Sequence, residues 1–301
     1  MADVLSTTAN GKLLFPSELV TEMMNTVKGK SSLAKMSAAE PVPFTGKTLF
    51  TFSLDKEIDV VAENGAKSKG GATVLPVNMV PVKVEYGARL SDEFDYASTE
   101  KKIDYLKQFA DGCQRKIARG IDIMAMHGFN PRTGAASAVI GDNHLDKAIT
   151  QIVTPGTEDA NAQMEAAIAL IRGSEEAPSG AIFAPAFTSS LAAIVKSDGN
   201  RMFPELAWGA EPGMINGLAV DTNPTVSFNS NKDLAIVGNF EEYFKWGYAR
   251  DMEIEIIRYG NPDNDTTLGD LKGHNQIYMR TEAYIAWAIL QPSAFSVIRA
   301  A

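Results

Sequence analysis

Chemically reactive side chains are sparse in this chain of 301 residues, and none falls into a known catalytic pattern. The three histidines, His127, His144 and His274, lack metal-ligand neighbours at useful spacings, and the chain has no set of cysteines to bind zinc. The nucleophile, phosphate-loop and zinc-protease motifs are also absent. We therefore expect no catalytic, cofactor-binding or metal-binding residues, and no cofactor.

Two pairs of neighbouring carboxylates, Glu175-Glu176 and Glu241-Glu242, are the remaining candidates for acid–base chemistry. Adjacent residues on a helix face different directions, so neither pair predicts a general acid working with a general base. A pair assembled in space from distant residues would still make an enzyme. A soluble α/β enzyme therefore stays open as an alternative.

The other distinctive side chains have simpler interpretations. His127 ends a predicted helix, where it suits the negative end of the helix dipole. Cys113 is the single cysteine and falls on the apolar side of that helix, which predicts core packing and a reducing compartment for folding. Trp208, Trp246 and Trp287 are expected to be packing anchors.

Composition excludes several classes of protein. Hydrophobic residues make up 45%, enough for a real core, while the net charge of −9 and the lack of a basic cluster argue against a dedicated DNA binder. The start of the chain lacks the pattern of a signal peptide, and no apolar run approaches transmembrane length. We expect no membrane association.

Residues 48–90 form the most informative segment, because two alternating runs flank a glycine-rich tip. Apolar residues at every second position share one face of a strand. In the first limb these are Phe50, Phe52, Leu54, Ile58, Val60 and Ala62, and in the return limb Val80, Val82, Val84, Tyr86, Ala88 and Leu90. The tip holds Asn64-Gly65 and Gly70-Gly71, which predict a flexible turn.

A hairpin of this length is expected to reach beyond its own domain. Each limb spans roughly 45–50 Å, whereas a compact domain of this size has a radius of gyration of about 19 Å. An isolated hairpin is only marginally stable, so we expect the arm to lie on another copy of the chain. The alternative is an ordinary hairpin within a larger sheet. The residues expected to contact the neighbour are Phe52, Leu54, Ile58, Val60, Lys67, Lys69, Val82, Val84 and Tyr86.

The return limb generates a specific expectation. Aspartate at Val82, Val84 and Tyr86 should leave the later α/β lobe folded but block particle formation, because each copy would lose roughly 1.5–3 kcal/mol of apolar burial per large side chain.

A long helix follows the hairpin. Ser98 is a suitable N-cap, and the spacing of apolar residues extends the helix to His127, with Gly128 as its stop. The expected apolar stripe is Ile103, Leu106, Phe109, Ala110, Cys113, Ile117, Ile121 and Met124. The opposite side is charged and is expected to face solvent.

In the rest of the chain, the spacing of apolar residues predicts a short helix at 15–28 and an α/β lobe. Loops occupy 129–157, a polar surface loop occupies 260–275, and one long strand covers 276–299. The lobe is expected to contain helices at 158–172 and 187–195 and strands at 181–184, 218–220, 234–237 and 252–257.

The ordered set of motifs resembles the major capsid protein of tailed bacteriophages, with the Hong Kong ninety-seven-like fold. The phrases that carry the resemblance span nearly the whole chain. They are Phe15 to Leu19, Val61 to Lys67, Val82 to Phe94, Asp122 to Gly128, Asn216 to Val220, Val237 to Phe240 and Pro292 to Phe295.

This resemblance implies an α+β fold with five parts. These are an N-terminal arm with a short helix (1–47), an extended β-hairpin loop (48–90), a peripheral domain (91–149) with a spine helix at 98–128, an axial α/β domain (150–275), and a C-terminal strand (276–301) that returns to the peripheral domain.

The resemblance also implies partners and a location. Copies of the chain would form pentameric and hexameric capsomers of an icosahedral shell around double-stranded DNA, which is held without sequence-specific binding. A separate scaffold protein, a portal and decoration proteins are further implied partners. The shell would be assembled in the host cytoplasm and become the virion capsid.

Two family features do not carry over directly. The extended loop begins within the first 50 residues, so a long N-terminal scaffolding segment is not expected, and either a separate scaffold protein exists or none is needed. Lys67 and Lys69 lie at the tip where some relatives form a covalent crosslink to an asparagine of another subunit. No partner asparagine can be matched here, so we expect no crosslink. The alternative assembly with this fold is an encapsulin-type shell around cargo enzymes.

Overall fold

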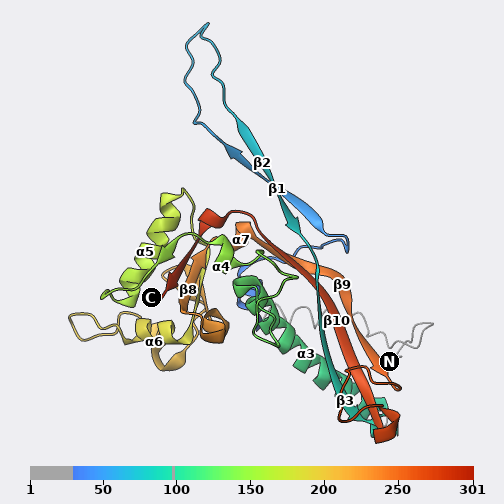
Figure 1. The fold of residues 1–301 in the computed structure, drawn as a ribbon. Helices are drawn as coiled ribbons and strands as arrows, with labels where there is room; N and C mark the ends of the chain where they lie inside the picture. Colours follow the sequence, from blue (N-terminus) through green and yellow to red (C-terminus); the bar gives the residue numbers. More distant parts are fainter. Residues whose placement is uncertain (1–29, 97–98) are drawn as a thin grey trace.

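The computed structural model describes residues 30–96 and 99–301, and three β-sheets organise this part of the chain (Figure 1). A two-stranded sheet forms a projecting arm, a three-stranded sheet runs beside the longest helix, and a six-stranded sheet forms a separate lobe. The helix predicted at 15–28 and the N-cap predicted at Ser98 lie outside the described residues.

The arm is an antiparallel hairpin of β1 (Lys47–Leu54) and β2 (Ala72–Met79). Lys47 lies opposite Met79 at its base, and Leu54 lies opposite Ala72 where the ladder ends. Met79 is fully buried and packs in a small cluster that includes Val42. Beyond the ladder, residues 55–71 extend the arm away from the body (Figure 1).

The return limb predicted at 80–90 is wrong. The return strand of the hairpin is β2, and β3 (Val82–Ser91) instead pairs antiparallel with β10 (Gln276–Ile289) in the three-stranded sheet. Residues 80 and 81 interrupt the two strands, and Pro81 has no N–H to donate to a ladder. Both strands alternate with the same period, so the pattern alone could not assign them to different sheets.

Val82, Val84 and Tyr86 therefore belong to the body of the subunit rather than to the arm. Val82 and Val84 pack against the main hydrophobic core, and the Tyr86 ring lies 6.2 Å from the Phe109 ring of the long helix. The role expected of these residues in an arm contact is corrected accordingly, since aspartate there would place charge against the core of its own subunit.

The strand predicted at 252–257 is the distal end of β9 (Phe244–Ile257), which pairs with β10 in the three-stranded sheet and not with the α/β lobe. The predicted single strand at 276–299 is also two strands. β10 ends at Ile289, a turn at Pro292–Ala294 follows, and β11 (Phe295–Arg299) enters the six-stranded sheet. Pro292 marks this break, and the apolar residues on both sides concealed it.

Three connections along the described chain join the three-stranded and six-stranded sheets, and two of them lie against each other. One runs from β8 (Asp233–Gly238) through α7 (Phe240–Tyr243) into β9, and the other runs from β10 into β11. The Leu290 N–H donates to the Tyr243 carbonyl at 2.8 Å, and the Phe240 and Phe295 rings meet edge-on at 5.3 Å. The two lobes are joined through this double connection.

The long helix is confirmed as α3 (Thr99–His127). Gly128 adopts a left-handed φ of 70°, and its N–H donates to the Met124 carbonyl at 2.9 Å, which is the expected helix stop. The apolar stripe faces the core, with buried side chains at Leu106, Ala110, Cys113, Ile117, Ile121 and Met124.

The lobe contains a six-stranded sheet in the order β4-β11-β8-β5-β7-β6. The helices predicted at 158–172 and 187–195 are confirmed as α5 (Ala160–Gly173) and α6 (Pro185–Ala193). Asp159 caps α5 by accepting from the Ala162 N–H at 2.8 Å. The remaining strands are β4 (Ile152–Val153), β5 (Gly180–Phe183), β6 (Met214–Ile215) and β7 (Leu218–Thr222).

Short elements complete the described chain. The short helices are α2 (Ser32–Met36) and α4 (Leu145–Ala148), and the 3-10 segments not yet mentioned are Asp92–Tyr96, Pro204–Gly209, Pro224–Ser230 and Lys272–His274. Among the residues described, no helix is both long and apolar enough to cross a bilayer.

Two of the three tryptophans are packing anchors as predicted. Trp246 and Trp287 are each 1% exposed in the main core. The prediction for Trp208 is wrong, because this side chain is fully exposed and its residue has a left-handed φ of 62°. Residue type alone could not separate a core tryptophan from one on a surface turn.

The assignment of β3 to the body makes a testable distinction between two valines. Val84→Asp places a charge against the core of the subunit and should lower the free energy of unfolding by about 1–3 kcal/mol. Val74 lies on the arm at a half-exposed position, so Val74→Asp should change the free energy of unfolding by less than about 0.5 kcal/mol. Denaturant unfolding of the unassembled subunit measures both, and equal losses would contradict the assignment.

Candidate assembly surfaces

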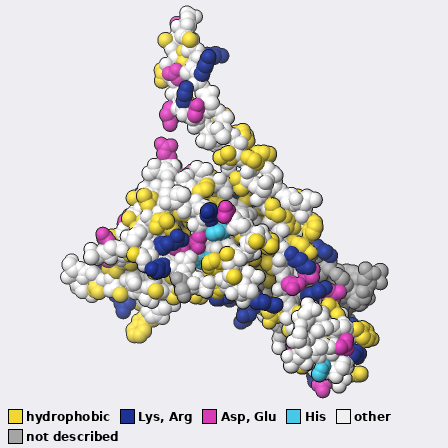
Figure 2. Space-filling view, in the orientation of Figure 1, with side chains coloured by type: hydrophobic (Ala, Val, Ile, Leu, Met, Phe, Trp, Pro, Cys, Tyr) yellow, Lys and Arg dark blue, Asp and Glu magenta, His cyan; other side chains and the backbone are white. Residues whose placement is uncertain are grey.

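One face of the arm is apolar on both strands. Because residues directly opposite each other share a face, the register pairs Phe50 with Pro76 and Phe52 with Val74 on that side. Leu54 and Ala72 continue the same face at the end of the ladder. Figure 2 shows hydrophobic side chains gathered along this lower part of the arm.

The described residues of the subunit leave this apolar face largely uncovered. Phe50, Phe52 and Leu54 are 61%, 72% and 74% exposed, and Val74 is 47% exposed. Contiguous exposed apolar surface of this kind marks an interaction site in a folded protein. Full burial of each large side chain would contribute roughly 1.5–3 kcal/mol.

The distal arm combines exposed apolar and charged side chains. Ile58 and Val60 are 95% and 94% exposed, and Lys67 and Lys69 lie on the other limb. The limbs stay together near the ladder because the Gly71 N–H donates to the Asp55 carboxylate at 2.6 Å. Six of the nine predicted contact residues thus lie on the arm: Phe52, Leu54, Ile58, Val60, Lys67 and Lys69. The other three lie in β3.

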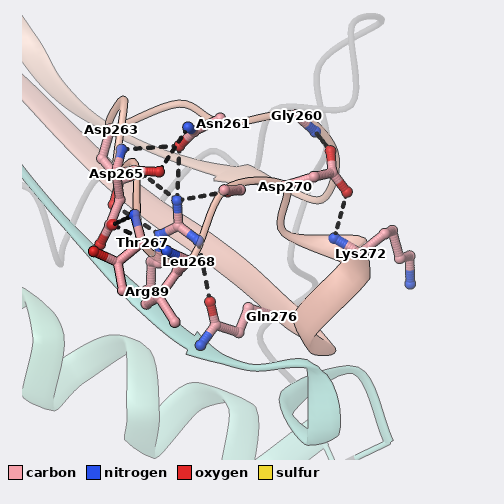
Figure 3. A network of polar contacts seen from close by, with 11 residues as sticks. Arg89, Gly260, Asn261, Asp263, Asp265, Thr267, Leu268, Asp270, Lys272 and Gln276 are labelled. Atoms are coloured by element: carbon pink, nitrogen blue, oxygen red, sulfur yellow. Dashed lines mark hydrogen bonds and ion pairs between the residues drawn. The ribbon is translucent and has the colours of Figure 1, made fainter.

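A second surface lies at the far end of the three-stranded sheet, where one arginine organises the loop at 258–275 (Figure 3). The Arg89 guanidinium donates to the Asp263 carboxylate at 2.8 Å, to the Asn261 side chain at 2.8 Å and to the Gly269 carbonyl at 2.9 Å. Its Nη1 donates to Gln276 at 3.3 Å. The side chain of Arg89 is only 8% exposed.

Carboxylates in this loop complete the network. The hydrogen bond from Arg89 lowers the pKa of Asp263 to about 2. Asp265 accepts from the Thr267 and Leu268 N–H groups at 2.7 and 3.0 Å, which closes the turn. The polar surface loop predicted at 260–275 is confirmed, but no pattern along the chain indicated that a residue of β3 would hold it.

A buried carboxylate ties the long helix to the start of the described chain. Asp122 of α3 accepts from the Ser31 hydroxyl at 2.6 Å and from the Ser32 and Leu33 N–H groups at 3.1 and 3.2 Å. Asn223 donates to it at 2.8 Å. Burial raises the pKa of Asp122 to about 6, although these hydrogen bonds oppose the rise.

A cluster at the end of α3 joins the helix to the lobe. His127 Nδ1 lies 2.7 Å from an Asp146 oxygen, and Nε2 donates to the Thr225 carbonyl at 2.8 Å. The Arg299 Nη2 lies 2.9 Å from Asp146 and 3.2 Å from Asp233. His127 is therefore a buried tie between elements and more than the helix-end cap predicted from its position.

This cluster combines attraction between opposite charges with repulsion between two carboxylates, since Asp146 raises the pKa of Asp233. Burial lowers the pKa of His127, but the bond and charge of Asp146 outweigh it and leave the pKa above its ordinary value. Burial raises the pKa of Asp233 to about 6 against the effect of Arg299. The ligand atoms of His127, Asp146 and Asp233 lie within 4.8 Å of one another, but Arg299 already supplies positive charge to both carboxylates.

Comparison with known proteins decides the family. The sequence profile of the phage capsid family matches residues 11–300, almost the whole chain. The chain belongs to the phage capsid family. No curated protein sequence matches this capsid protein.

Solved structures agree with this assignment. A chain from Mycobacterium phage Ogopogo is 29% identical with a TM-score of 0.77, and the match covers 90% of the capsid protein and 92% of that chain. A chain from Gordonia phage Cozz is 22% identical with a TM-score of 0.74, covering 90% and 87%. A structure described as the capsid of a native GTA particle is 11% identical with a TM-score of 0.61, covering 100% and 96%.

These findings confirm the fold and the role expected from the sequence. The capsid protein has the Hong Kong ninety-seven-like fold and is a structural protein of the major capsid shell. It associates with itself into capsomers and is located in the virion capsid. The encapsulin and enzyme alternatives are not favoured.

The Arg89 network predicts how the loop at 258–275 responds to mutation. Arg89→Lys keeps the charge but loses the planar fork that reaches several acceptors at once. Amide hydrogen exchange in residues 260–270 should accelerate, while exchange in α5 should not change. Lys83→Ala is a suitable control, because it removes a more exposed ion pair of the same strand. Unchanged exchange in Arg89→Lys would show that the loop is held by other contacts.

The cluster at His127 predicts a pH dependence of stability. A histidine whose pKa is raised by folding stabilises fully below about pH 6.5, and this contribution is lost as the pH rises through the raised value. His127→Gln should therefore lower the free energy of unfolding by about 1–3 kcal/mol near pH 6 and by less near pH 8. Thermal unfolding between pH 6 and pH 8 measures whether the difference in stability between His127→Gln and the unmodified protein narrows as the pH rises.

The exposed histidine His274 provides the control for this experiment. His274→Gln should show the same pH profile as the unmodified protein. A constant difference between His127→Gln and the unmodified protein from pH 6 to pH 8 would contradict the assigned charge on His127.

Proposed function

We propose that the capsid protein builds its shell by laying the arm on a neighbouring copy. The exposed apolar face of β1 and β2 supports this proposal most directly, because residues 30–96 and 99–301 do not cover it. The contact residues would be Phe52, Leu54, Ile58, Val60, Lys67 and Lys69. Each large side chain of the arm that is buried on the neighbour would contribute about 1.5–3 kcal/mol to the contact.

We also propose how the copies are arranged in the particle. The copies form pentameric and hexameric capsomers of an icosahedral shell around double-stranded DNA, and assembly takes place in the host cytoplasm. A net charge of −9 suits a wall that faces DNA without binding it tightly or reading its sequence. A scaffold protein, a portal and decoration proteins are the expected partners. The protein carries no catalytic activity in this proposal.

The two faces of the arm allow a matched test. Phe52→Asp with Val74→Asp places two charges opposite each other on the apolar face, and Ser53→Asp with Thr73→Asp does the same on the other face. The first pair should abolish megadalton particles in size-exclusion chromatography and electron microscopy while the subunit stays folded. The second pair should assemble to at least about half the normal yield, since it leaves the apolar face intact.

Normal particles from Phe52→Asp with Val74→Asp would contradict the proposed role of the arm. The contents of normal particles test the other part of the proposal. DNase-protected double-stranded DNA in particles from the natural host system would support a phage shell, and an enclosed protein cargo without DNA would contradict it.

A further inference from the structure

Four cations gather at the C-terminal half of α3. Arg115, Lys116 and Arg119 are exposed on the helix, and Arg132 is exposed in the loop that follows it. Residues three and four apart are neighbours on a helix surface, so the three side chains of α3 form one strip. Lys116, Arg119 and Arg132 also line a groove of about 530 Å³ beside β3, which places Arg132 next to that strip. We call these four residues the basic cluster.

Within the described part of the subunit, the basic cluster is not neutralised. Across residues 30–96 and 99–301, no ion pair joins any of its four members to a carboxylate. Lys83 on the same groove differs, because it is paired with Glu282 at 2.9 Å, and Glu85 is the single carboxylate in the lining. The whole chain carries a net charge of −9, so this surface departs from the charge of the rest of the molecule. An anionic partner would complement it.

Two of the cations are held in place by their surroundings. The guanidinium of Arg119 lies over the Phe228 ring, 5.7 Å from its centre, which leaves the N–H groups in the guanidinium plane open to other acceptors. Arg132 lies in a turn closed by Asn130. The Arg132 N–H donates to the Asn130 side chain at 3.0 Å, and the Gly134 N–H donates to the Asn130 carbonyl at 2.8 Å. Positions fixed in this way reduce the entropy lost on binding.

The groove beside the cluster also contains an unpaired polar atom. Thr281 is 1% exposed, and its hydroxyl oxygen has no hydrogen-bond partner within the described part of the chain. Leaving a buried hydroxyl without a partner costs free energy. A water molecule or a phosphate oxygen in the groove would supply that partner, since Ser and Thr hydroxyls are among the groups that contact phosphates in complexes with DNA.

These features favour a chain of phosphates over a single small anion. A small anion is held where several donors converge on one point, whereas the cations of the cluster are spread along more than one turn of an exposed helix. Duplex DNA carries one negative charge per about 1.7 Å of its axis, so it offers several phosphates to such a strip at once. Contacts to phosphates carry no sequence information, which suits DNA that is enclosed without being read.

We propose that the basic cluster binds the phosphate backbone of double-stranded DNA packaged in the shell. The exposed face of α3 then forms part of the inner wall of the particle. The proposal rests on the proposed enclosure of DNA, and it assigns the contact to one surface of the subunit. Four contacts are few, so each copy binds weakly, while the many copies of a shell act together on the same DNA.

The salt dependence of DNA binding counts the contacts. Each neutralised phosphate contributes about −0.9 to the slope of log K against log salt concentration, so four contacts predict a slope of about −3.6. Lys116→Gln with Arg132→Gln should reduce the slope to about −1.8. Arg172→Gln with Lys196→Gln is the matched control, because it removes the same charge from exposed positions on the other lobe and should leave the slope unchanged. Fluorescence anisotropy of a short labelled duplex with the unassembled subunit measures all three slopes.

The slopes can also contradict the proposal. An equal slope for Lys116→Gln with Arg132→Gln and for the unmodified subunit would overturn it. An equal drop in the control variant would overturn it as well, because net charge alone would then govern binding. Two duplexes of unrelated sequence should bind alike, since contacts made to phosphates do not read bases.

Chemical protection tests the contact inside particles. Gly112 is exposed on the same strip, one turn before Lys116, and a Cβ at this position meets nothing within 4 Å. The natural Cys113 is buried. The thiol of Gly112→Cys should therefore react with maleimide more slowly in DNA-filled particles than in empty shells. Gly173→Cys on α5 is equally unobstructed and should react alike in both. Equal reactivity of Gly112→Cys in filled and empty particles, whether fast or slow, would overturn the proposal.

These outcomes separate the basic cluster from the enclosure of DNA. If particles contain DNase-protected DNA while the cluster variant keeps its slope and Gly112→Cys stays equally reactive, the enclosure stands and the assigned surface is wrong. If particles contain a protein cargo without DNA, the proposed function itself is wrong, whatever the subunit binds in solution.

Discussion

A two-stranded ladder has two faces and no second layer of its own, and this constraint governs the structure. The base of the arm is buried against the body at Met79, but the face that carries Phe52 and Val74 is left exposed by the described part of the subunit. Apolar burial is the dominant source of stability in folding and in association. In the proposed assembly, another copy supplies the layer that this face lacks.

The body has to be rigid for such an arm to be useful. The arm makes its contact far from the body, so a small movement at the base of the arm becomes a large displacement at its tip. Loose packing of the body would therefore misplace the tip. Buried polar ties remove this freedom: Asp122 holds the start of the described chain to α3, and the group formed by His127, Asp146, Asp233 and Arg299 holds α3 to the lobe. Because each tie joins elements distant in sequence, the ties form only in the completed fold.

Much of this architecture was predictable from local patterns, and the failures share one cause. The spacing of apolar residues identified α3, α5 and α6, and Gly128 correctly marked a helix end. Alternation identified β3 and β10 as strands but could not choose their partners, since pairing depends on residues far apart in the sequence. The role of Arg89 was missed for the same reason: its acceptors lie more than 170 residues away.

The double crossing between the two sheets has a mechanical consequence. A closed container under outward pressure is stretched within its wall, and each building block must carry that tension from one side to the other. Here two of the covalent backbone segments that join the sheets run side by side, and the bond between Leu290 and Tyr243 fastens them together. Separating the two lobes would require pulling strands lengthwise out of both sheets, which shears many hydrogen bonds together rather than opening them one at a time.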